Sequence, residues 1–203
     1  MPTLNKARET ARKASCVSIL KQYGNACILY ANGFDDYWLP AQPPDWPWNL
    51  AWRNMLDAPG ENPYNPGGPV GDERTLPALV CPSAFFALQD VKNGKVPMTK
   101  SYGLNMGNYY AGDRVRAAKL SRVREPSRAV SHADSLGWNL TGEAAGDTLS
   151  HLAQTAETVN GWQTIMAYRH NSGFAANGVF YDGHVQTCDR ETMVNRVVWK
   201  NFY

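Results

Sequence analysis

The chain has 203 residues, 43% of them hydrophobic, and this length favours one domain with room for a sizeable core. Its 20 lysines and arginines nearly balance 18 aspartates and glutamates, and the net charge of +2 excludes a globally basic nucleic-acid-binding protein and an acidic disordered chain. Two basic segments, residues 1–21 and 113–128, lack the interleaved aromatic residues of a strand-binding groove, so we expect no nucleic-acid partner.

A long helix over residues 3–31 is the first predicted element. Cysteine, leucine and tyrosine residues recur in it at intervals of 4, 3, 4 and 3, which places on one face Cys16, Leu20, Tyr23, Cys27 and Tyr30. Asn32 and Gly33 both tolerate left-handed backbone angles, so we expect the helix to end there. Its C-terminal half needs a surface to pack on, whereas its N-terminal half is thin and charged.

Prolines and tryptophans are concentrated in the next segment, residues 40–75. Eight of the 13 prolines fall between residues 40 and 69, which disfavours regular sheet. A short helix over residues 46–57 is allowed, with Asp45 as its cap. Two interpretations of the tryptophans stay open, a platform for a carbohydrate or other ligand and rings that hold a long loop onto the domain. These tryptophans are Trp38, Trp46, Trp48 and Trp52.

Short apolar segments separated by turn residues follow over residues 76–203, which is typical of strands in a small antiparallel sheet. The clearest signal is residues 178–188, where Asp182 and Gly183 separate two apolar runs and predict a hairpin with a two-residue turn. One helix followed by a run of strands predicts an α+β domain. We therefore expect a single domain over residues 1–203.

The histidines are the natural place to look for catalysis or metal binding. His170, Asp182 and His184 lie near one another in the sequence, and His132 with Asp134 would join them if their strands were adjacent. No HExxH or CxxC spacing is present, and an aspartate beside a turn glycine is explained by backbone geometry alone. The sequence therefore predicts no catalytic residue, no cofactor-binding residue and no metal site here.

Asp35 and Asp36, just past the helix, are the candidates for calcium, because hard carboxylate oxygens suit that ion. Two adjacent carboxylates do not define a site by themselves. A solvated pair in a turn is the alternative, and calcium is the single cofactor that we consider.

The four cysteines are Cys16, Cys27, Cys81 and Cys188. On one helix, Cys16 and Cys27 would lie about 16 Å apart along the axis, far beyond the roughly 7 Å that a disulfide spans. Two connectivities then remain if the protein is exported to an oxidising compartment. Four reduced, buried thiols are the alternative.

Several segments, in order, resemble one family. They are residues 2–22, the Cys81-Pro82-Ser83 element, residues 101–105, residues 126–135, Arg169-His170 and the Asp182-Gly183-His184 signature. Together they resemble bacterial type II secretion pseudopilin-like, prepilin-type proteins with a processing-associated histidine/Asp-Gly domain, as found in planctomycete- and lentisphaera-type bacteria. His170 and Asp182 are separated by eleven residues, two more than in the family pattern. This insertion argues against a rigid shared role for the two.

The resemblance implies a pilin-like fold, with the long helix packed on an antiparallel sheet and the segment 40–75 as an insertion. It implies a non-enzymatic subunit whose partners are other pilin-like subunits and the secretion machinery. It also implies anchoring in the inner membrane through an apolar helix upstream of Leu4, with Met1 as a cloning start and a periplasmic or extracellular domain. An extracytoplasmic carbohydrate- or ligand-binding module that uses the tryptophans is the alternative.

The family pattern also carries Cys16 and Cys81 together. The resemblance therefore implies the disulfide Cys16–Cys81, and with it Cys27–Cys188.

Overall fold

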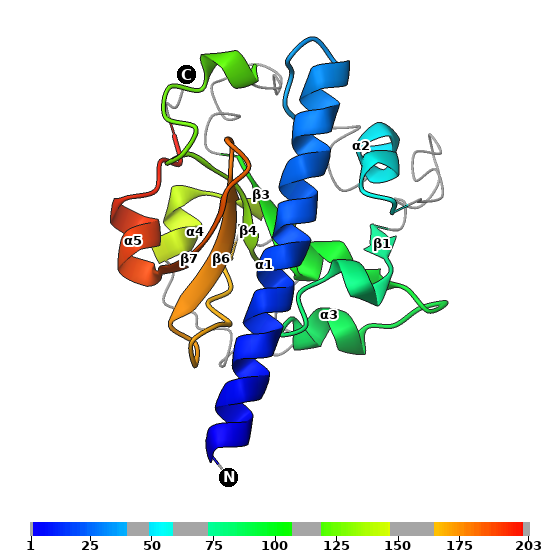
Figure 1. Cartoon of the computed structure of the whole chain (residues 1–203), viewed down its shortest axis with the longest axis vertical. Coiled ribbons are helices and arrows are strands. Elements are labelled where there is room, and N and C mark those ends of the chain that lie inside the picture. Colours follow the sequence, from blue (N-terminus) through cyan, green and yellow to red (C-terminus); the bar gives the residue numbers. More distant parts are fainter. Residues whose placement is uncertain (1, 40–48, 59–72, 107–118, 147–164, 201–203) are drawn as a thin grey trace.

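The computed structural model describes residues 2–39, 49–58, 73–106, 119–146 and 165–200. Within these ranges the protein is an α+β structure, as predicted, built around one long helix (Figure 1). In chain order the elements are α1 (Pro2–Gly33), α2 (Leu50–Met55), β1 (Arg74–Thr75), η1 (Pro77–Leu79), α3 (Phe85–Gln89), β2 (Val96–Pro97), η2 (Met98–Lys100), β3 (Tyr102–Asn105), η3 (Leu120–Arg122), β4 (Val130–Asp134), β5 (Asn139–Leu140), α4 (Gly142–Gly146), β6 (Ala175–Phe180), β7 (Val185–Asp189) and α5 (Arg190–Asn195).

Helix α1 follows the predicted helix closely, and the five residues of its predicted face, from Cys16 to Tyr30, are all buried. The helix ends at Gly33, as predicted, but the residues with left-handed angles differ from the expected ones. They are Asp35 and Asp36, with φ of 50° and 67°, and not Asn32 and Gly33. The amide of Asp36 donates back to the carbonyl of Ala31 at 2.9 Å and closes this turn.

The main sheet has five strands in the order β5-β3-β4-β6-β7. Its neighbours are antiparallel except for β3 and β5, which run parallel, so the prediction of an antiparallel sheet is wrong at that edge. Along the chain, β4 comes between β3 and β5, so the chain reverses direction twice and β5 returns parallel to β3. A separate antiparallel pair is formed by β1 and β2.

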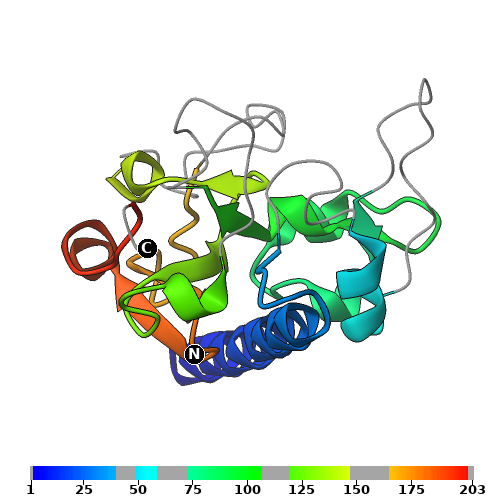
Figure 2. The ribbon, with the colours of Figure 1, turned by 90° about the horizontal axis from the view of Figure 1, so that it is seen from above.

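Helices cover both faces of the five-stranded sheet. Figure 2 shows α1 along one face, with α4 and α5 away from it. The side chains of β6 alternate accordingly, because Val179 belongs to the core cluster that contains α1 and Phe180 to the cluster that contains α4 and α5. Two apolar cores thus lie back to back across the sheet.

The hairpin predicted at Asp182-Gly183 is present as β6 and β7, but its turn is longer than predicted. Four residues, 181–184, separate the strands. The amide of Gly183 donates to the carbonyl of Phe180 at 2.8 Å, and Gly183 alone has a positive φ, at 81°. A two-residue type I′ turn would require Asp182 to adopt positive φ as well, so the predicted turn type is wrong.

The proline- and tryptophan-rich region is described only in part, because residues 40–48 and 59–72 lie outside the described ranges. The predicted short helix exists as α2, but its cap is Asn49, whose side chain accepts from the amide of Trp52 at 3.0 Å. Asp45, the predicted cap, lies outside the described residues. The ring of Trp52 packs edge-on against Tyr23 of α1, with 5.3 Å between centroids.

Candidate functional site

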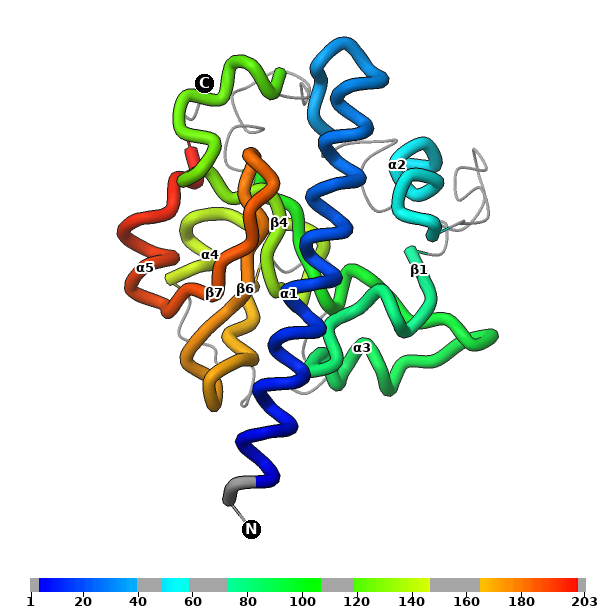
Figure 3. The backbone as a smooth tube through the Cα atoms, viewed as in Figure 1, coloured from blue at the N-terminus to red at the C-terminus, as the bar shows by residue number. Residues whose placement is uncertain are grey.

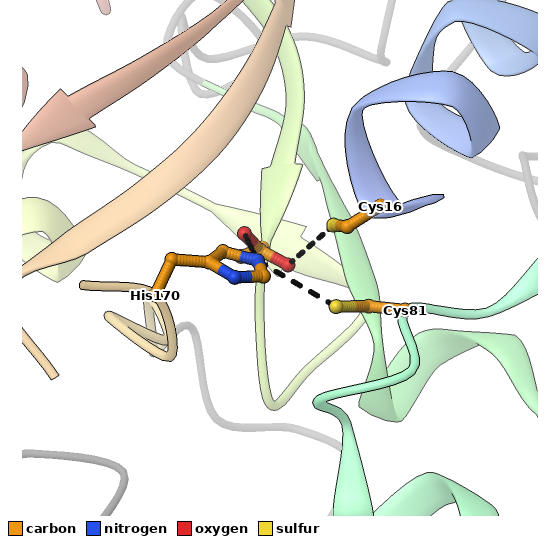
Figure 4. Close-up of side chains that lie close together, drawn as sticks. Cys16, Cys81 and His170 are labelled. Carbon is orange, nitrogen blue, oxygen red and sulfur yellow. Dashed lines mark hydrogen bonds and ion pairs between the residues drawn. The ribbon is translucent and has the colours of Figure 1, made fainter. Parts of the chain in front are cut away.

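Four side chains of ligand-forming type meet at a buried point beside α1 (Figure 4). Cys16 comes from α1, Cys81 from the segment between η1 and α3, Asp134 from the end of β4, and His170 from the bridge that precedes β6. All four residues have 0% exposed surface. Their ligand atoms lie within 4.8 Å of one another, and we refer to them as the Cys–Asp–His cluster.

Local structure fixes each member of the cluster. Cys16 lies on the periodic face of α1 and is the first fully buried position from its N-terminal end among the residues whose side chains are described. Cys81 begins a tight turn in which its carbonyl accepts from the amide of Ala84 at 2.8 Å. His170 exchanges backbone hydrogen bonds with Ala175 at 2.9 and 3.0 Å, which closes the turn before β6.

The imidazole of His170 is the centre of the cluster. Its Nε2 lies 3.6 Å from Sγ of Cys81 and 3.2 Å from Oδ2 of Asp134. The thiol of Cys16 completes the set, with Sγ 3.6 Å from Oδ1 of Asp134. One ring nitrogen, two sulfurs and one carboxylate thus converge from four separate segments.

Backbone amides hold the two potentially anionic members in place. The amide of Asn177 donates to Oδ2 of Asp134 at 2.7 Å, and the amide of Ser83 donates to Sγ of Cys81 at 3.4 Å. Hydrogen bonds of this kind stabilise a carboxylate and a thiolate. The cluster is therefore supported for negative charge at two of its four members.

Arg169 places a positive charge beside the cluster. Its Nη1 lies 3.6 Å from Oδ1 of Asp134. The same guanidinium donates to the carbonyls of Ser101 at 3.0 Å and Ser135 at 2.7 Å, so its position is fixed. This buried pair is well hydrogen-bonded, which is the condition for tolerating charge in the interior.

The surroundings shift the pKa values of the cluster in opposite directions. Burial raises the pKa of Cys16 well above its ordinary value. Burial would also raise the pKa of Cys81, but hydrogen bonds to its sulfur from Cys16 and His170 outweigh it and lower that pKa. For His170, burial alone would lower the pKa, and the bonds to Asp134 and Cys81 instead raise it. Cys81 is thus the member most ready to be a thiolate.

The geometry does not match a nucleophilic relay. In a cysteine–histidine–aspartate relay, the two ring nitrogens of the histidine serve two different partners. Here Nε2 of His170 faces both Cys81 and Asp134, while Nδ1 has no hydrogen-bond partner among the described residues. The cluster is also sealed from solvent, so a substrate has no way to reach the sulfur.

The predicted histidine/Asp-Gly signature is divided between two places. His170 lies in the cluster, whereas Asp182 and His184 form an exposed pair in the β6–β7 turn, with Oδ1 and Nδ1 2.6 Å apart. The strand β6 lies between them, and its six residues span about 20 Å. Gly183 supplies the positive φ of that turn. The signature therefore does not form one site.

The aspartates considered for calcium have different surroundings. Asp35 is exposed in the turn after α1. The carboxylate of Asp36 accepts from both the amide and the hydroxyl of Ser121, and these bonds lower its pKa. Asp36 thus ties the end of α1 to η3, and this role accounts for its carboxylate without calcium.

All four cysteines are buried with free sulfurs in the structure. Cys16 and Cys81 do lie together in the Cys–Asp–His cluster. The predicted pair Cys27–Cys188 is contradicted, because Cys27 belongs to the core on the α1 face of the sheet and Cys188 to the core on the opposite face. The sheet itself separates these two sulfurs.

The ligand platform expected from the tryptophans is contradicted for the two that are described. Trp38 and Trp52 are both 0% exposed, so neither ring faces solvent. The indole nitrogen of Trp38 donates to Oγ of Ser131 at 2.8 Å, and its ring packs on Tyr181. Trp46 and Trp48 lie outside the described residues. The described tryptophans fasten the loop region to the core.

Comparison with protein-family models, with curated protein sequences and with solved structures finds no match to this chain. The family resemblance therefore stays a prediction that its motifs alone support. No helix among the described residues is both long and apolar enough to cross a membrane.

Sequence reasoning missed the cluster as a unit. It assigned Cys16 and Cys81 to a disulfide and weighed His170 with Asp182, whereas the structure joins His170 to Asp134. The sequence does hold part of the information. It groups Asp134 with the histidines and Cys16 with Cys81, but no spacing rule connects the first group to the two cysteines.

Proposed function

We propose that the chain is a pilin-like subunit of a type II secretion or type IV pilus-like assembly, and that it acts by assembly and display rather than by catalysis. The observation that carries the proposal is the division of α1 into two halves. Residues 16–31 are packed on the body, whereas residues 4–15 are exposed or half-buried and extend past it (Figure 3).

The projecting half of α1 has few contacts that would stabilise it in the isolated subunit. The packed half nucleates these turns, but most of the stability of a protein helix comes from packing, which the projecting half largely lacks. Within the described residues, its links to the body are a few side-chain contacts, such as Glu9 with the amide of Ser172 at 2.6 Å and Lys13 with Asn171 at 3.2 Å. A helix with so little support gains stability from a partner, and neighbouring subunits would supply it.

The charge of this half indicates what kind of surface it meets. Lys6, Arg8, Arg12 and Lys13 outnumber Glu9, so the projecting half is basic. Basic side chains suit acidic subunit surfaces or the anionic head groups of the inner membrane. We place the subunit at the inner membrane before assembly, with its sheet-containing body on the periplasmic or extracellular side.

Site-specific photocrosslinking in the source bacterium tests this proposal. A photoreactive amino acid is placed at Arg8 or Arg12 in the projecting half, and at Val194 on α5 as a matched exposed control, 42% of whose surface is accessible. We expect Arg8 and Arg12 to give ladders of crosslinked pilin-like subunits in the membrane and sheared-filament fractions. Val194 should give far fewer.

Two outcomes would contradict the proposal. One is a protein that is confined to the cytoplasmic fraction and runs as an uncrosslinked monomer whichever position carries the photoreactive amino acid. The other is equal crosslinking at Val194 and Arg8, because random collision would then explain the products and the projecting half would have no special partner.

A further inference from the structure

The Cys–Asp–His cluster has a donor set that metal ions use and that folding alone does not require. Two thiols, a carboxylate and an imidazole occupy one buried point, and the carboxylate and the imidazole are costly to bury without partners. The sulfurs of Cys81 and Cys16 lie 3.6 Å from His170 and 3.6 Å from Asp134, so all four groups are directed at one another. An apolar core residue at each position would be easier to accommodate.

We propose that Cys16, Cys81, Asp134 and His170 bind one zinc ion as a structural site. Thiolate, imidazole and carboxylate are the protein ligands of zinc, and four of them make the closed tetrahedral shell of a structural site. This inference does not rest on the proposed pilin-like function, because it follows from the cluster alone.

The distances agree with a tetrahedral shell. With bonds of about 2.3 Å from zinc to sulfur and about 2.0–2.1 Å to nitrogen and oxygen, the edges of the tetrahedron are about 3.5 Å from sulfur to nitrogen, 3.6 Å from sulfur to oxygen and 3.4 Å from nitrogen to oxygen. The structure gives three of these edges: 3.6 Å from Sγ of Cys81 to Nε2 of His170, 3.6 Å from Sγ of Cys16 to Oδ1 of Asp134, and 3.2 Å from Nε2 of His170 to Oδ2 of Asp134. The last two end on different oxygens of one carboxylate, and the ligand atoms as a set lie within 4.8 Å of one another. The side chains therefore close in on the ion when it binds through a single oxygen of Asp134.

The donor atoms also converge correctly. Nε2 of His170 is the atom that faces both Cys81 and Asp134, as one coordinating nitrogen must. A relay would have used both ring nitrogens, but a metal site needs only one. Because ligand softness favours zinc where two thiolates are present, calcium and magnesium are excluded as its occupants.

Charge balance supports the same ion. Zinc with two thiolates, one carboxylate and a neutral imidazole carries a net charge of −1, and two protons, one from Cys16 and one shared by Cys81 and His170, leave to solvent on binding. Arg169, with Nη1 3.6 Å from Oδ1 of Asp134, brings the whole to neutrality. The amides of Ser83 and Asn177 then serve as outer partners of a thiolate and a carboxylate ligand.

A surface groove lies beside the cluster. It runs between the projecting half of α1 and the turn before β6, and its lining includes Arg12, Ser83 and Arg169. Ser83 and Arg169 both contact cluster members directly, so a single layer of residues separates the cluster from this groove.

Metal analysis of the purified chain tests the proposal. The full chain is prepared under reducing conditions without chelator, and its zinc is measured by inductively coupled plasma mass spectrometry. We expect about one zinc per chain in the wild type and in Cys27→Ser, a control that alters a buried cysteine of α1 outside the cluster. Cys16→Ser and Cys81→Ser should lose most of it.

Cobalt gives a second readout, and its first measurement needs only the wild type. Co²⁺ added to the reduced, metal-free wild type should produce the visible bands of a tetrahedral site and a near-ultraviolet sulfur-to-cobalt band. Replacing one thiolate should weaken the latter band by about half. Chelator should lower the thermal midpoint of the wild type and of Cys27→Ser, but not that of Cys81→Ser.

Either of two results would overturn the zinc site. One is a reduced, natively folded wild-type chain, checked by circular dichroism, that takes up neither zinc nor cobalt. The other is a Cys16–Cys81 disulfide in protein isolated from the source bacterium with its thiols blocked during lysis, since the two sulfurs cannot be bonded to each other and to zinc together.

Discussion

Replacing Gly24 with alanine tests how closely α1 approaches the sheet. Gly24 lies in the packed half of the helix, and a Cβ atom added there would lie 2.6 Å from Cγ2 of Val179 on β6. Its next neighbours, the Cα and carbonyl oxygen of Gly183, would be 3.6 Å away, at ordinary contact distance. Val179 is therefore the single obstacle that the structure shows.

Two opposing effects set the magnitude. Alanine is the better helix former by about 1 kcal/mol, which favours the variant. Overpacking typically costs about 1–3 kcal/mol, and Val179 is β-branched, stiff at χ1 and 0% exposed, so it has little room to turn away. The cost of overpacking should therefore lie in the upper part of that range, at about 2–3 kcal/mol, and Gly24→Ala should lose about 1–2 kcal/mol of unfolding free energy overall.

Urea unfolding followed by circular dichroism measures this loss, and a double-mutant cycle identifies its cause. In a Val179→Ala background the obstacle is gone, so Gly24→Ala should stabilise the protein by about 0.5–1 kcal/mol. The matched control is Gly33→Ala at the end of α1, where the added Cβ meets only Met55 at 3.9 Å. If Gly24→Ala stabilises equally in both backgrounds, α1 does not pack on β6 in this register, and the reasoning fails.

Two further variants test the core and the surface. Trp38→Ala should lower the unfolding free energy, measured by urea unfolding, by about 3–5 kcal/mol, since it empties a fully buried site. A variant that stayed as stable as the wild type but lost glycan binding would instead support the interpretation of the tryptophans as a ligand platform. Asp90 is partly buried, which opposes its ionisation, but bonds from Lys100 and Arg74 outweigh this and lower its pKa. Wild type should therefore exceed Asp90→Asn in stability above about pH 5, and urea titrations should show this advantage lost as the pH falls through the lowered pKa.

The sequence predicted α1 well because a helix is a local structure. Its buried face needs only the interval between residues, and Cys16 through Tyr30 are buried at the expected positions. Its end at Gly33 was predicted as well, but the left-handed residues were not, because Asn32, Gly33, Asp35 and Asp36 all tolerate such angles. Asp36 is held in its turn by Ser121, far away in the chain, whose amide and hydroxyl donate to its carboxylate.

The sheet and the cluster depend on contacts between segments that are distant in the sequence, and the spacing of apolar residues does not predict such contacts. The parallel pairing of β5 with β3 follows from the path of the chain and not from the two residues of β5. In the same way, Asp134 becomes a partner of His170 because Ala133, beside it in β4, pairs with Gly178 of β6. The Asp-Gly signature drew attention to Asp182 beside His170, and the eleven residues between them argued against a shared role, but no spacing in the sequence singled out Asp134 instead.

The position of Cys16 connects the two proposals without making either depend on the other. Cys16 marks the point where α1 leaves the body, because the described side chains before it are exposed or half-buried and its periodic face after it is buried. In an assembly that engages the projecting half, a force on the helix reaches the buried core of the body at this point, beyond the surface contacts of Glu9 and Lys13. An ion that joins α1 to β4 and to the segments of Cys81 and His170 would fix the direction in which the helix projects. If loss of the ion leaves the fold intact but abolishes the Arg8 crosslinks, the cluster sets the geometry of assembly; if the crosslinks persist, it serves the stability of the subunit alone.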